Sequence, residues 1–163
     1  MTLQLTQKEK NYLEDQKKHE QICIKKYQKY AGQTQDPQLQ QLFTALAGSE
    51  QQHYNTINQM LSGQVPQLSQ QSGSQSQQQA ASSAQTGQSA PASQTTGSAG
   101  QNEASLCTDM LMTEKFVSGA YDTAIFESAN TNVRQALNHI QKEEQEHGEK
   151  IYNYMQSNGL YNG

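Results

Sequence analysis

The chain has 163 residues, a formal net charge of −4, and 16% charged side chains. This balance provides no basic footprint for nucleic acid or an anionic membrane. No apolar run is long enough to span a bilayer, and residues 1–10 lack the apolar core of a secretion signal. Two cysteines, Cys23 and Cys107, cannot form a disulfide framework. We expect them to be buried free thiols, which favours a reducing, intracellular compartment.

Residues 1–63 predict a first helix hairpin. Apolar side chains recur at helical spacing from about Thr6 to Ala31, and Gly32 is expected to end that helix. Asp36 then offers an N-cap before Pro37, and the next helix is predicted from Pro37 to about Leu61, ending at Ser62-Gly63. Because the connection is short, the two helices should pack antiparallel.

Residues 64–104 predict a linker. Most of this segment is Gln, Ser, Gly, Ala and Thr, with almost no charge and no apolar periodicity. Such a composition cannot bury enough apolar surface to offset the entropy lost on ordering, so we expect this segment to be disordered.

Residues 105–163 predict a second helix hairpin that repeats the first. Asn130 should cap its second helix, and Asn158-Gly159 should end it. The two hairpins align without a gap at a constant offset of 94, the difference between Glu20 and Glu114. A duplicated hairpin makes four helices, so the sequence predicts an all-α four-helix bundle of one domain, with a crossover linker between its halves.

Six polar residues interrupt the apolar stripes at matching places in the two repeats. They are Glu20, Glu50, His53, Glu114, Glu144 and His147. Glu20 lies sixteen residues before the cap at Asp36 and Glu50 fourteen after it, so both carboxylates stand within roughly 3 Å of one level. Packing the hairpins together would bring four carboxylates and two imidazoles into the bundle centre. Two divalent cations would neutralise the carboxylates.

Other interpretations of these residues remain open. A glutamate and a histidine three residues apart can be a surface pair worth a few tenths of a kcal/mol, although all six residues lie on apolar stripes, which favours a metal site. Tyr27 and Tyr121 are expected to be core aromatics whose hydroxyls bond inward, with a redox role as the alternative. The remaining candidates are expected to face solvent: His19, His139, Glu14, Glu127, Glu143 and Glu146.

This ligand pattern resembles the ferritin-like superfamily of di-iron and di-manganese carboxylate bundles, over both hairpins but not the linker. The resemblance implies that Glu50 and Glu144 bridge two metal ions and that Glu20 and Glu114 each cap one ion. It also implies that His53 and His147 each ligate one ion. Both iron and manganese accept carboxylate and imidazole ligands, so the sequence does not choose between them.

The second hairpin also resembles the spore coat F family of endospore-forming bacteria. The similarity lies in Asp109-Met110-Leu111, Asn132-Val133-Arg134, the run 151–155 and Gly159-Leu160-Tyr161, and it covers about Leu106 to Asn162. It implies synthesis in the mother cell, a place in the spore coat, and self-association or contact with other coat proteins. It carries no catalytic motif.

Two functional hypotheses follow. One is a structural spore coat component that holds a di-metal site in its bundle. The other is a di-iron or di-manganese oxidase or peroxide-scavenging enzyme, with O2 or peroxide as substrate. A storage cage is disfavoured because a long linker would crowd the surface of a shell.

Overall fold

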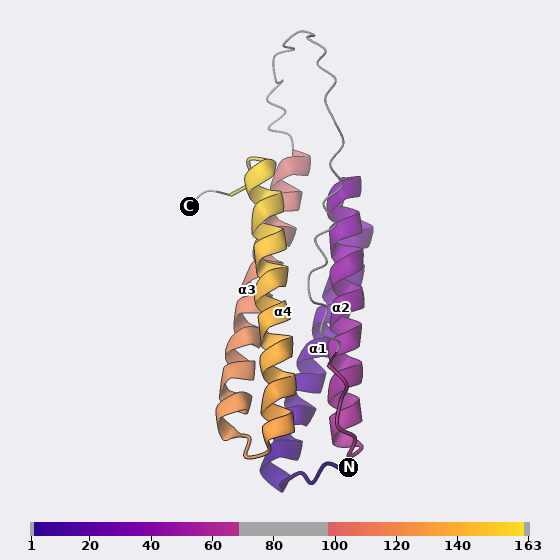
Figure 1. The fold of residues 1–163 in the computed structure, drawn as a ribbon. Helices are drawn as coiled ribbons and strands as arrows, with labels where there is room; N and C mark the ends of the chain where they lie inside the picture. The colour runs from indigo at the N-terminus through magenta and orange to yellow at the C-terminus, as the bar shows by residue number, and fades with distance from the viewer. Residues whose placement is uncertain (1, 69–97, 162–163) are drawn as a thin grey trace, which may run out of the picture.

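The computed structural model describes residues 2–68 and 98–161 (Figure 1). Four helices make up the regular structure of these residues: α1 (Gln7–Gln33), α2 (Pro37–Leu61), α3 (Ser98–Glu127) and α4 (Thr131–Ser157). One isolated antiparallel bridge joins Thr2 to Gln64, beside the end of α2. The prediction of an all-helical fold built from two hairpins is confirmed. None of the described helices is long and apolar enough to cross a membrane.

The predicted helix starts at Pro37 and Thr131 are confirmed by their caps. The Asp36 carboxylate accepts a hydrogen bond from the backbone N–H of Gln38, and the Asn130 side chain accepts one from Asn132. Capping residues of this kind satisfy backbone donors that the first helical turn leaves free. Gly63, at φ +82°, follows α2 in the left-handed conformation that glycine adopts without strain.

Two predicted boundaries were wrong. Gly32 does not end α1, which continues to Gln33 and is capped by Thr34; nothing lies close to Gly32, so a glycine is tolerated there within the helix. α3 begins at Ser98, within the segment predicted to be linker. Leu106 and Cys107 are buried against the other helices, and packing of this kind sustains helices whose own propensity is weak. The predicted disorder of residues 69–97 falls outside the described residues.

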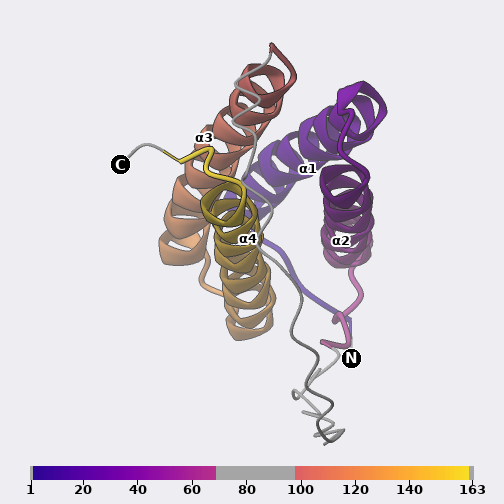
Figure 2. The same cartoon turned by 90° about the horizontal axis from the view of Figure 1, so that it is seen from above.

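Neighbouring helices in the bundle run antiparallel. α1 packs against α2 and α3, while α4 packs against α3 and α2 (Figure 2). The end of α2 lies at the end of the bundle where α1 begins, and α3 begins at the opposite end (Figure 1). The two points that the connection joins therefore lie at opposite ends of the bundle, as the sequence predicts.

The apolar core is divided into two clusters along the bundle. One contains Leu13 and Ile57 of the first hairpin with Val133 and Leu137 of the second. The other contains Phe43 and Leu46 with Met110 and Ile151. The six polar residues singled out from the sequence occupy the level between these clusters, so they are enclosed by apolar side chains along the bundle axis.

Each hairpin also closes the short loop of the other. Oε1 of Glu9 on α1 accepts a hydrogen bond from the backbone N–H of Asn130, 2.8 Å away. Oε1 of Glu103 on α3 accepts one from the backbone N–H of Gln35, 3.0 Å away. Glu9 and Glu103 are equivalent residues in the two repeats, and both are buried. The two halves are thus joined reciprocally at both ends of the bundle.

Candidate metal centre

The six residues singled out from the sequence meet in the middle of the bundle, and all are buried, none more than 3% exposed. Their ligand atoms form two groups, and within each group the atoms lie within 4.8 Å of one another. The members of the first group are Glu20, Glu50, His53 and Glu144, and those of the second are Glu50, Glu114, Glu144 and His147. Glu50 and Glu144 belong to both groups.

The two histidines point the same ring atom at the carboxylates. Nδ1 of His53 lies 3.1 Å from Oε2 of Glu50 and 3.2 Å from Oε1 of Glu144. Nδ1 of His147 lies 3.3 Å from Oε1 of Glu50 and 3.2 Å from Oε2 of Glu144. The rings stack, with centroids 5.5 Å apart. Spacing of three residues places each histidine one turn after its own glutamate on the same helix face, which explains this convergence.

The arrangement leaves several buried oxygen and nitrogen atoms without a hydrogen bond among the described residues. They are Oε2 of Glu20, Oε1 of Glu50, Oε2 of Glu114, both carboxylate oxygens of Glu144 and Nδ1 of His147. Buried polar atoms are normally paired, and an unpaired one raises the free energy of the folded state by about 1–3 kcal/mol. So many unpaired atoms around one point fit a cation at that point, and carboxylate and imidazole are the donors that iron and manganese accept.

Two tyrosines orient the remaining carboxylate oxygens. Tyr121 on α3 donates a hydrogen bond to Oε1 of Glu20, and Tyr27 on α1 donates one to Oε1 of Glu114. Both tyrosines are fully buried. The expectation that their hydroxyls bond inward is confirmed. What the sequence did not reveal is that each tyrosine serves the glutamate of the other repeat.

Burial affects the two shared glutamates most strongly. Removal from water raises the pKa of Glu50 to about 8, and the nearby charge of Glu20 adds to this effect. Burial and the same charge hold the pKa of Glu144 well above its ordinary value. Both shared carboxyl groups are therefore largely protonated at neutral pH in the metal-free protein.

The other four groups are charged in the metal-free protein. Burial opposes ionisation of Glu20 and Glu114, but the nearby imidazoles of His53 and His147, respectively, bring the pKa of each carboxyl below its ordinary value. Burial likewise disfavours the imidazolium forms, yet the surrounding carboxylates raise the pKa of His53 well above normal and that of His147 to about 11. Two anions and two cations leave the metal-free centre with no net charge.

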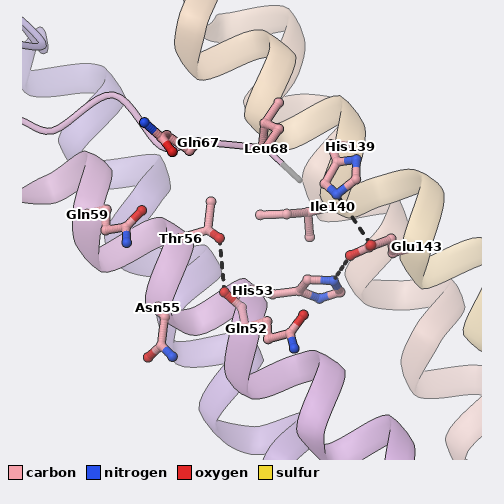
Figure 3. A pocket seen from close by; sticks show the side chains of 10 residues that line it. All are labelled: Gln52, His53, Asn55, Thr56, Gln59, Gln67, Leu68, His139, Ile140 and Glu143. Atoms are coloured by element: carbon pink, nitrogen blue, oxygen red, sulfur yellow. Dashed lines mark hydrogen bonds and ion pairs between the residues drawn. The ribbon is translucent and has the colours of Figure 1, made fainter. Parts of the chain in front are cut away.

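Glu143 lies beside the centre, which corrects the expectation that it faces solvent. Its Oε2 is 2.6 Å from Nε2 of His53, and its Oε1 is 3.3 Å from Nε2 of His139. The hydrogen bond from His53 is the main reason that the pKa of Glu143 is lowered. Figure 3 shows these three side chains in line at the edge of a pocket that also contains Gln52 and Leu68. His139 is half-buried rather than fully solvated.

Of the remaining residues expected to face solvent, Glu14, Glu127 and Glu146 are exposed. His19 is half-buried, with its ring edge against Phe116 at a centroid distance of 5.6 Å. Cys23 and Cys107 are buried free thiols, as predicted.

Comparison with known proteins finds a similarity that covers the second hairpin. Residues 102–162 match the family model of the Coat F domain. The second hairpin is therefore similar to the Coat F domain. The matched range contains nearly all of α3 and the whole of α4, and with them Glu114, Glu144 and His147. No curated protein and no solved structure gives a significant match.

Proposed function

We propose that this chain is a spore coat protein whose helical bundle holds two divalent metal ions, iron or manganese. The Coat F domain supports the coat role, with other coat proteins or further copies of the chain as partners. One observation carries the metal site. The two groups of ligand atoms overlap in Glu50 and Glu144, and shared carboxylates of this kind fit two ions placed side by side.

The residues of the chain divide into three roles. Glu50 and Glu144 would contribute ligands to both metal positions, while Glu20 with His53, and Glu114 with His147, would complete one position each. Tyr121 and Tyr27 hold the outer carboxylates in place. The core clusters above and below the site exclude water along the bundle axis. When bound, a pair of iron or manganese ions supplies the capacity to exchange electrons with O2 or peroxide.

Charge supports the assignment as well. Two divalent ions with four ionised carboxylates and two neutral imidazoles again sum to zero net charge. The loaded site therefore buries no more net charge than the metal-free one does. This matters because an uncompensated charge in an apolar core is strongly destabilising.

Metal analysis tests the proposal directly. The full chain, stripped with a chelator, is incubated with Mn(II), or with Fe(II) under anaerobic conditions, and freed of unbound ions. We expect about two ions per chain, and a melting temperature that rises because ligand at 100 times its Kd stabilises by about 2.7 kcal/mol. Electron paramagnetic resonance of the Mn(II) form should show two coupled ions. Absence of bound metal, with no change in melting, would show that the site is not a metal centre.

The coat role has its own test. The tagged full chain, produced during sporulation in an endospore-forming host, should be found by electron microscopy in the layers around the spore. Uniform labelling of the spore core would contradict it.

An enzyme that consumes O2 or peroxide is the second candidate, favoured by the pocket that reaches His53 and Glu143 from the surface. A small solute in this pocket would lie beside His53 and Glu143. Peroxide consumption by the metal-loaded chain, absent from the Glu50→Gln variant, would establish it. Equal rates for both proteins would leave the coat role with a non-catalytic metal site.

A further inference from the structure

The two halves of the centre differ in what holds the outer nitrogen of each histidine. Nε2 of His53 lies 2.6 Å from Oε2 of Glu143, while Nδ1 of the same ring faces the shared carboxylates. His147 also turns Nδ1 inward, toward Glu50 and Glu144, but no hydrogen bond or ion pair joins its outer nitrogen, Nε2, to another described residue. The outer nitrogen of His53 is thus held by a carboxylate, and that of His147 is not.

The sequence repeat shows that this difference is built into the chain. At the offset of 94 that superposes the two hairpins, Glu143 corresponds to Ser49 and His139 corresponds to Ala45. All six candidate ligands have an identical counterpart at this offset, but the residues that flank His53 do not. A serine hydroxyl carries no charge and is too short to replace the carboxylate that spans from α4 to α2.

The difference also concerns access. Glu143, His53 and His139 line a pocket open to the surface, together with Gln52, Thr56 and Gln59 (Figure 3). Three other pockets on the described residues include neither His147 nor Glu114 in their walls. The His53 side of the centre therefore has a surface pocket beside it.

A carboxylate that accepts the outer N–H of a ligating histidine fixes the ring orientation and increases the basicity of the inner nitrogen. Loss of such a partner typically weakens metal binding by about 10–100-fold. We propose that Glu143 is a positioning residue for His53, so that the metal position formed by Glu20 and His53 fills first and binds its ion more tightly than the position formed by Glu114 and His147. This inference rests on the proposed metal site.

Titration of the metal-free full chain with Co(II), followed by visible absorption and calorimetry, tests it. We expect two steps, the first tighter than the second. Glu143→Ser, which installs the residue of the first repeat, should weaken the first step by about 10–100-fold and leave the second unchanged. Glu143→Gln keeps a carbonyl acceptor without the charge. Its affinity in the first step should lie between those of the unmodified chain and Glu143→Ser. Glu146→Ser on the same helix is the matched control. Glu146 is exposed, and its substitution removes the same charge as Glu143→Ser.

Two ligand variants assign each step to its position. In a His147→Gln background one ion should still bind tightly, and adding Glu143→Ser should weaken it. In a His53→Gln background the remaining ion should bind weakly and should not respond to Glu143→Ser. Circular dichroism of each metal-free variant checks that the bundle has formed.

The outcomes separate this inference from the proposal on which it rests. If the unmodified chain binds two ions but Glu143→Ser and Glu146→Ser titrate alike, Glu143 does not position His53, and the metal centre stands without it. If the unmodified chain binds no Co(II), the metal centre itself is refuted and this inference with it.

Discussion

Tyr121 on α3 donates its hydroxyl hydrogen bond to Glu20 on α1, so a residue of the second hairpin orients a candidate ligand of the first. In the equivalent hydrogen bond of the other half, Tyr27 on α1 donates to Glu114 on α3. A buried carboxylate needs its hydrogen bonds, since water cannot supply them. The site is therefore assembled by both hairpins at once.

Replacement of Tyr121 by phenylalanine should destabilise the metal-free protein by about 1–3 kcal/mol, because Oε1 of Glu20 would stay buried without its donor. Urea unfolding at pH 7 measures this change. Tyr161→Phe is the matched control, since Tyr161 is exposed near the C-terminus. Equal stability of the two variants would show that the hydrogen bond does not stabilise the fold.

Glutamine substitutions should separate the shared glutamates from the outer ones. Glu50 is largely protonated at pH 7, so Glu50→Gln should leave the stability of the metal-free chain nearly unchanged while abolishing two-metal binding. Glu20→Gln removes an anion that faces the His53 imidazolium and should lower metal-free stability. Urea unfolding and metal stoichiometry measure both effects. The assignment of protonation states fails if Glu50→Gln is the more destabilising change.

Metal binding should release protons. At pH 7 two carboxyl groups and two imidazolium groups carry protons that the bound ions must displace, so about four should leave when two ions bind. Apparent affinity should therefore increase with pH, and less steeply above about pH 8, where Glu50 is already ionised. Calorimetry in buffers of different ionisation enthalpy counts the protons. Binding independent of pH between 6 and 8 would contradict the predicted charge states.

The connection between the hairpins should control topology. α2 has 25 residues and is roughly 38 Å long, and the chain must cover about that distance to reach α3. Replacing residues 64–97 by four residues leaves a reach of roughly 14 Å, which should force exchange of hairpins between two chains. Light scattering gives the mass. A 20-residue replacement is the control and should stay monomeric, because halving a loop changes its closure entropy by only about 0.6 kcal/mol.

Glu9 should contribute stability that depends on pH. Burial opposes its ionisation, but hydrogen bonds from the backbone N–H groups of Thr6 and Asn130 outweigh it and lower the pKa. A lowered pKa contributes stability above the unfolded value of about 4.3, and that contribution is lost as the pH falls through the folded value. The difference in unfolding free energy between the native chain and Glu9→Gln should thus be largest near pH 7 and smaller at pH 3. Glu14→Gln, exposed on the same helix, should show no such trend.

Sequence periodicity predicted the features that depend on the residue spacing within a single helix. The caps Asp36 and Asn130, the hairpins and the convergence of six polar residues on one level all follow from spacing along single helices. The constant offset between repeats then implied that equivalent side chains meet across the bundle.

Contacts between helices were beyond this reasoning. Glu143 lies next to a stripe residue, and only its long side chain, reaching from α4 to α2, brings it to His53. Glu103 fell within a segment of linker composition, although it corresponds at the same offset to Glu9, and that correspondence was a signal available in the sequence.

The reciprocal loop closure by Glu9 and Glu103 bears on ancestry. Two identical copies of the hairpin 98–161, related as the halves are here, would provide two Glu103 caps, two Tyr121 donors and a full set of carboxylates and imidazoles from Glu114, Glu144 and His147. The present chain has the layout of a symmetric dimer joined into one polypeptide. Once joined, each half can change alone. Ser49 stands at the position equivalent to Glu143, which is a difference of this kind. An obligate homodimer could not have acquired it on one side only.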